Sequence, residues 1–139
     1  MRTIKFRGKR VDNGEWVYGD YHRRAGYVHT IIEMEPDEDG KVCYALNQVI
    51  PDTVGQFTGL LDNKGERIYE GDIIRGDCGN GEVRHLISFF NIIASFVAEM
   101  LPDHDIHDYC TLSQAWILKY NKEVIGNIHD NPELLKQNE

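Results

Sequence analysis

The residues in this chain that most suggest chemistry lie in one short loop, Pro102 to Asp108. His104 and His107 stand three residues apart in this loop and alternate with carboxylates. Imidazole nitrogens and carboxylate oxygens are ligands for zinc and related divalent ions, so a metal site made of His104, His107, Asp103 and Asp105 is one interpretation. The HExxH frame, in which a Glu between two His ligands acts as base, is absent. A polar surface loop is therefore favoured, and a metal-dependent hydrolase is an alternative function.

Basic residues near the N-terminus form a second candidate site. Residues 1 to 24 hold seven Lys or Arg against three acids, which gives this segment a charge of +4. Because the whole chain has a net charge of −8, residues 25 to 139 carry −12. Basic side chains on a strand can contact phosphates, although a solvated strand face is the simpler interpretation. The predicted nucleic-acid-binding residues are Lys5, Arg7, Lys9, Arg10, Arg23 and Arg24. Because the whole molecule repels a polyanion at long range, nucleic-acid binding is an alternative function.

The three cysteines, Cys43, Cys78 and Cys110, are widely spaced and include no CxxC pair. This spacing predicts neither a disulfide framework nor a zinc knuckle, and reduced thiols fit a cytoplasmic protein. Cys78 is predicted to be exposed at a loop tip, without a neighbouring base to activate it. No window of 18 uncharged apolar residues occurs, so we expect a soluble protein without a membrane partner. We predict no cofactor and no catalytic residue.

The elements that must position these groups are organised around residues 54 to 74. Gln56 to Leu61 is rich in β-favouring residues, and the polar cluster 62 to 65 ends in Gly65, which suits the left-handed turn position. Arg67 to Tyr69 returns as the partner strand, and Gly71 then allows a corner before a third strand. Two strands and a redirected third predict the start of a small barrel.

The rest of the chain also reads mainly as strands. Residues 86 to 100 have helical spacing but are apolar on nearly every side, so we expect two strands that turn near Asn91, with a helix as the alternative. Residues 111 to 120 are read as a strand, with a short helical turn before it as a variant. Asn131 is placed to cap a short terminal helix with Pro132 at its first position. The predicted organisation is a β-meander lobe over 1–53, a small barrel over 54–130 and a helix with tail over 131–139.

The central wording GQFTGLLDNKGERIYEGDIIR resembles the signature of the YopX family, small proteins of phages and prophages. Other pieces match in the same order, namely 5–9 (KFRGK), 16–19 (WVYG), 124–128 (VIGNI) and 131–135 (NPELL). The residues taken as the structural signature are Gly55, Gly59, Gly65, Tyr69, Gly71, Asp72, Gly126, Asn127 and Pro132.

The resemblance implies a β-rich protein with an SH3-type barrel and brings no catalytic residue with it. The leading prediction is therefore a non-enzymatic accessory or regulatory binding protein of phages or prophages, located in the bacterial cytoplasm. Small open barrels leave edge strands that suit a protein partner or self-association, so a homo-oligomer is expected.

Overall fold

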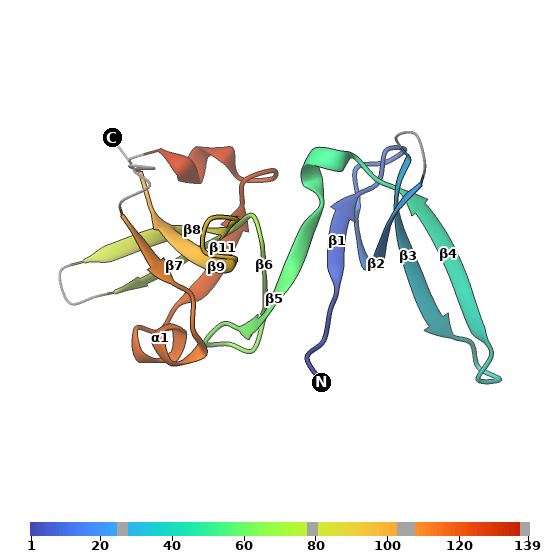
Figure 1. The fold of residues 1–139 in the computed structure, drawn as a ribbon, viewed down its shortest axis with the longest axis horizontal. Helices are drawn as coiled ribbons and strands as arrows, with labels where there is room; N and C mark the ends of the chain where they lie inside the picture. The colour runs from blue at the N-terminus through green and yellow to red at the C-terminus, as the bar shows by residue number, and fades with distance from the viewer. Residues whose placement is uncertain (25–27, 78–80, 103–107, 137–139) are drawn as a thin grey trace. The chain divides into compact units, whose positions relative to one another are not determined.

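The computed structural model describes residues 1–24, 28–77, 81–102 and 108–136. The chain divides into two compact units, Met1–Phe57 and Thr58–Glu139 (Figure 1). Strands dominate both units, and the prediction of a mainly β protein is confirmed.

The first unit is an antiparallel sheet built from consecutive hairpins. Its strands lie in the order β4-β3-β2-β1-β5, and β5 continues into the second unit, where β6 pairs with it. The bounds are β1 Phe6–Lys9, β2 Trp16–Arg24, β3 Val28–Pro36, β4 Val42–Gln48, the 3-10 helix η1 Pro51–Thr53 and β5 Gly55–Leu61. A bridge between Arg10 and Val49 links the residue after β1 to the residue after β4.

The core of this unit is small. Val17, Ile31 and Val49 are buried together, and Phe6 and Tyr21 pack against them with their rings 5.5 Å apart. These side chains come from β1, β2, β3 and the residue after β4, so one face of the sheet supplies the core. On the opposite face, Met34 of β3 and Val42, Tyr44 and Leu46 of β4 are exposed.

The second unit contains a five-stranded antiparallel sheet in the order β10-β9-β8-β7-β11. Its elements are β6 Arg67–Tyr69, β7 Asp72–Asp77, β8 Glu82–Phe90, β9 Ser95–Met100, β10 Tyr109–Thr111, α1 Gln114–Lys119, β11 Glu123–Asn127 and the 3-10 helix η2 Pro132–Leu135. The buried core residues are Ile68, Ile74, Ile87, Ala98, Leu112 and Ile117.

The two strands expected in residues 86 to 100 are confirmed, because β8 and β9 pair from His85↔Met100 to Phe90↔Ser95. The strand expected over 111 to 120 is wrong beyond Thr111: that stretch forms α1, whose first turn is capped when Trp116 N–H donates to Ser113 Oγ at 3.2 Å. The terminal helix is present as the 3-10 helix η2, with Pro132 in its first turn. The cap expected from Asn131 is wrong, because the Asn131 side chain makes no capping hydrogen bond and its Oδ1 accepts from the Asn127 N–H at 3.2 Å instead. No closed barrel occurs among the strands of the described ranges, so the SH3-type barrel stays a prediction.

Candidate functional site

The predicted metal ligands His104, His107, Asp103 and Asp105 lie outside the described residues, as does Cys78. Across the ranges that are described, no group of three or more His, Cys, Asp or Glu side chains is arranged to hold a metal ion. No helix in those ranges is long and apolar enough to cross a membrane.

The predicted nucleic-acid-binding residues lie in different environments. Arg7 is buried with its guanidinium carbon 4.6 Å from the centre of the Trp16 ring, and Lys9 Nζ lies 5.4 Å from the same centre. Arg10 is paired with Asp12 through two hydrogen bonds of 2.9 and 2.7 Å. This pairing also lowers the pKa of the Asp12 carboxyl. Cation–π contact and ion pairing therefore occupy three of the six side chains.

Lys5, Arg23 and Arg24 complete the six. Lys5 is half-buried beside β1, and its carbonyl accepts from the Phe57 N–H at 2.7 Å. Arg23 and Arg24 are exposed at the end of β2. They are the members of the set best placed to meet a partner.

Residues of the central motif over 55–75 shape turns in the second unit. Asp62 is buried, and its Oδ1 accepts from the N–H groups of Lys64 and Glu66 at 2.9 and 2.8 Å. Its Oδ2 accepts from the Val124 N–H at 3.0 Å, which ties the β5–β6 turn to β11. Gly65 takes a φ of 85° in this turn, as the sequence pattern predicts.

The corner before β7 is built in the same way. The Tyr69 N–H donates to Asp72 Oδ2 at 2.7 Å, and the carboxylate is almost fully buried. Gly71 has a φ of 91°, and its N–H donates to the Ile87 carbonyl at 2.8 Å. These side chains stabilise the sheet corner through charge-assisted hydrogen bonds.

At the other end of the unit, Asn127 holds the loop that follows β11. Its Oδ1 accepts from the N–H groups of His129 and Asp130 at 3.0 and 2.9 Å. A Cβ at position 126 would lie 2.4 Å from Asn131 Oδ1, so a larger residue than Gly126 would displace the Asn131 side chain. Five residues of the signature, Gly65, Gly71, Asp72, Gly126 and Asn127, thus have local roles in turns and close packing.

A buried basic cluster sits beneath α1. Trp116 contacts the His85 ring edge-on at 5.1 Å between ring centres, and Lys122 Nζ lies 4.9 Å from the centre of the Trp116 ring. His85 and Lys122 are both buried. Burial, and secondarily the positive charge of Lys122, lowers the pKa of His85 to about 4, so the imidazole is neutral at pH 7.

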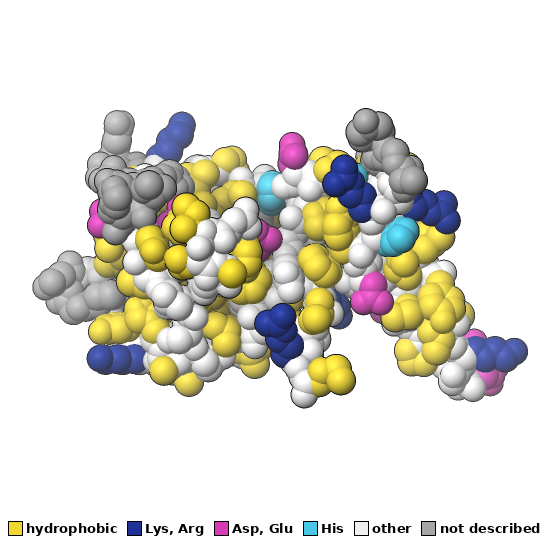
Figure 2. Space-filling model, in the orientation of Figure 1, with side chains coloured by type: hydrophobic (Ala, Val, Ile, Leu, Met, Phe, Trp, Pro, Cys, Tyr) yellow, Lys and Arg dark blue, Asp and Glu magenta, His cyan; other side chains and the backbone are white. Residues whose placement is uncertain are grey.

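The most exposed apolar surface of the first unit lies on its β3–β4 hairpin. Val42, Tyr44 and Leu46 on β4 are 53%, 68% and 66% exposed, and Met34 on β3 is 50% exposed. The register Ile32↔Leu46 and Met34↔Tyr44 places all of them with Ile32 on one side of the sheet. We call these five residues the β3–β4 apolar face, and Figure 2 shows hydrophobic side chains over this hairpin.

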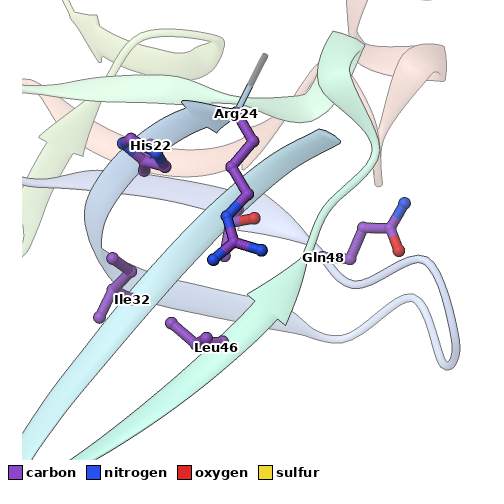
Figure 3. A pocket seen from close by; sticks show the side chains of 6 residues that line it. His22, Arg24, Ile32, Leu46 and Gln48 are labelled. Atoms are coloured by element: carbon purple, nitrogen blue, oxygen red, sulfur yellow. The ribbon is translucent and has the colours of Figure 1, made fainter. Parts of the chain in front are cut away.

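A shallow hollow of about 400 Å³ continues this face toward the end of β2. It is lined by His22, Arg24, Thr30, Ile32, Leu46 and Gln48. Figure 3 shows the Arg24 side chain extending across β3 toward Leu46, with His22 and Ile32 on the same side. The hollow therefore combines an apolar floor with one exposed guanidinium.

The outer side of β4 is an open backbone edge. Asp37 N–H donates to the Lys41 carbonyl, and Val49 N–H donates to the His29 carbonyl. In this register the backbone N–H and C=O groups of the odd-numbered residues of β4 point toward β3. The N–H and C=O groups of Val42, Tyr44 and Leu46 consequently point away from β3. In the described part of the chain no strand pairs with this outer side, because β4 ends the sheet.

Sequence reasoning predicted a β-meander lobe over 1–53 but missed this surface. The stretch VCYALNQ alternates without any charged residue, so its sequence does not indicate which face is buried. The available signal was the absence of charge and proline from a strand, since exposed edges are normally protected by both.

A sequence profile described as "YopX protein" matches residues 5–136, which agrees with the resemblance seen in the motifs. A search of curated proteins finds no match. Among solved structures, the "Crystal structure of protein EF1440 from Enterococcus faecalis" is similar, with a TM-score of 0.65, 22% sequence identity, and coverage of 98% of this chain and 100% of that chain. At this identity the structural likeness concerns the fold alone. Because the family profile covers nearly the whole chain, the chain belongs to the YopX protein family.

Proposed function

We propose that this protein is a non-enzymatic accessory or regulatory protein of phages or prophages, which acts in the bacterial cytoplasm by protein association. The observation that supports this function is the β3–β4 apolar face beside an open strand edge. Large exposed apolar patches on small proteins are typical of interaction sites. An edge strand also offers backbone groups to which a partner strand can add.

Three polar residues of the second unit support the non-enzymatic part of the proposal. Asp62, Asp72 and Asn127 have the polarity expected of catalytic groups, yet each accepts backbone N–H donors that shape a turn. Carboxylates used in this way are committed to stabilising the fold. For the second unit we propose an SH3-type barrel built on the β10-β9-β8-β7-β11 sheet, with the Gly71 corner as its sharp bend.

Nucleic-acid binding is a second candidate because Arg23 and Arg24 are exposed at the end of β2. It is less favoured, since Arg7 is buried, Arg10 is paired with Asp12, and the chain carries a net charge of −8. A metal-dependent hydrolase on the His104 and His107 loop has no support from the described residues.

The test of protein association is capture of partners from lysogenic cells with immobilised protein. Tyr44→Lys places a charge in the middle of the β3–β4 apolar face and is expected to abolish capture. Ile92→Lys is the control, because Ile92 is also a large exposed hydrophobic residue, 98% exposed, but lies in the turn between β8 and β9. Equal capture by both variants would contradict the proposed role of this face.

A further inference from the structure

We propose that the β3–β4 hairpin binds a second copy of the same chain, by antiparallel pairing of β4 with β4 around a twofold axis at Tyr44. This inference rests on the proposed function and names the partner for the same surface. The pairing sets Val42 opposite Leu46 of the second copy and Tyr44 opposite its own equivalent. The result is a continuous sheet that crosses from one copy to the other.

The backbone of β4 fits this register. The outward N–H and C=O groups belong to Val42, Tyr44 and Leu46, and an axis at Tyr44 pairs these residues among themselves. The free edge ends at Gln48, because its carbonyl accepts from the Val11 N–H at 3.0 Å. The twofold pair therefore uses the part of the edge that has no strand beside it in the described chain.

The side chains of β4 also fit a copy of themselves. No charged residue and no proline occurs from Val42 to Gln48, so self-pairing brings no like charges together and loses no ladder hydrogen bond. In the pair, Tyr44 lies beside the other Tyr44 on the apolar face, and each Leu46 lies beside a Val42. Aromatic and β-branched cross-strand pairs of this kind stabilise antiparallel sheets.

Charge along the hairpin selects the antiparallel orientation. The turn end carries Glu35, Asp37, Glu38, Asp39 and Lys41, whereas the opposite end of the hairpin adjoins His22, Arg23 and Arg24 on β2. Antiparallel pairing places the acidic end of each copy against the basic end of the other. Parallel pairing would place acid beside acid, which opposes association.

Arg24 is the basic side chain that we expect to attract the acidic turn of the second copy. It extends across β3 into the hollow that Leu46 and Gln48 also line (Figure 3). Neighbouring strands are about 5 Å apart, so the guanidinium lies within roughly one to two strand spacings of the second copy's turn. Arg24 and Glu38 are therefore expected to attract each other across the interface.

An interface made of one strand edge and its flanking side chains buries a small area compared with most protein interfaces. We therefore expect a reversible dimer with a dissociation constant of about 1–100 µM, which weakens as salt screens the paired ends. Sedimentation velocity of the full chain across this concentration range measures the dimer directly.

Tyr44→Pro is the decisive variant, because it removes an N–H that points outward while leaving the ladder to β3 intact. It is expected to weaken the dimer at least about tenfold. Tyr44→Thr keeps the N–H and loses only the ring, and Ile92→Lys is the surface control that stays dimeric. Arg24→Glu is expected to weaken the dimer about tenfold, and adding Glu38→Arg restores it to within about twofold.

Hydrogen exchange keeps the test independent of any variant's folding. In the wild-type chain the amides of Val42, Tyr44 and Leu46 are expected to exchange more slowly as concentration rises, whereas those of Cys43 and Ala45 already face β3 and change little. A dimer that neither Tyr44→Pro nor Arg24→Glu alone weakens overturns the inference.

The inference and the proposed function fail in different ways. A chain that is monomeric at 100 µM, yet captures a host protein that Tyr44→Lys loses, overturns self-pairing and retains the function. A monomer whose captured proteins ignore Tyr44→Lys overturns both.

Discussion

Replacing Asp62 with alanine is expected to destabilise the second unit by about 3 kcal/mol. Asp62 Oδ1 accepts from Lys64 and Glu66, which are exposed, so water can replace these two bonds after the change. Its Oδ2 accepts from Val124, a half-buried residue whose N–H would keep no protein acceptor in its place. One lost bond of this buried kind costs about 1.5–3 kcal/mol and each exposed one about 0.5 kcal/mol, which gives the stated total.

Asp37 provides a matched control in the first unit. Its Oδ1 accepts from Asp39 and Lys41 at 2.9 and 2.8 Å, the same spacing as in the Asp62 turn, but it is exposed and has no third partner. Asp37→Ala is therefore expected to cost only about 1 kcal/mol. The difference between the two variants isolates the bond from Asp62 to β11.

Urea unfolding followed by tryptophan fluorescence measures both changes, because Trp16 lies in the first unit and Trp116 in the second. Single-tryptophan variants separate the two signals. Asp62→Ala is expected to lower the midpoint of the Trp116 transition by about 2 M urea. A shift no larger than that caused by Asp37→Ala would refute the reasoning that Asp62 ties its turn to β11.

Burial lowers the pKa of His85 to about 4 in the folded protein, against about 6.5 in the unfolded chain. The unfolded chain therefore takes up a proton first as the pH falls, and the free energy of unfolding is expected to decrease by about 3 kcal/mol between pH 6.5 and pH 4. His85→Phe should flatten unfolding free energy against pH in this window, and an unchanged slope would contradict it. Gly126→Ala forces a Cβ to 2.4 Å from Asn131 Oδ1 and should cost about 2 kcal/mol in thermal denaturation, so an unaltered Tm would count against the contact. In fluorescence anisotropy, binding of labelled DNA or RNA should be confined to low salt and disappear when Arg23 and Arg24 become Gln; retention at 0.15 M salt would favour the nucleic-acid alternative.

Local chemistry explains which elements the sequence could predict. The β5–β6 hairpin was predictable because its turn is determined within a few residues, by Asp62 as acceptor and Gly65 at positive φ. Residues 86 to 100 could be assigned as strands because Asn91 begins a short turn, in which Ala94 N–H donates to the Asn91 carbonyl.

The element that sequence reasoning missed, α1, is set by one cap and by packing. It spans six residues, too few to show helical periodicity, and its aromatic content favoured a strand. The cap at Ser113 and the burial of Ile117 against the sheet decide the helix instead. Ser113 followed by Gln114 and Ala115 was the available signal, since a good cap precedes good helix formers.

The position of the family motifs relative to the candidate surface explains why family membership does not identify the partner. The matching pieces cover 5–9, 16–19, 55–75, 124–128 and 131–135, whereas the β3–β4 apolar face lies between Ile32 and Leu46. The motif residues described above shape turns and close packing, and none of the matching pieces includes a residue of the β3–β4 apolar face. Identification of the partner therefore depends on variants of Tyr44 and Arg24, because changes to the motif glycines and acids are expected to lower the stability of the fold and do not alter the β3–β4 apolar face.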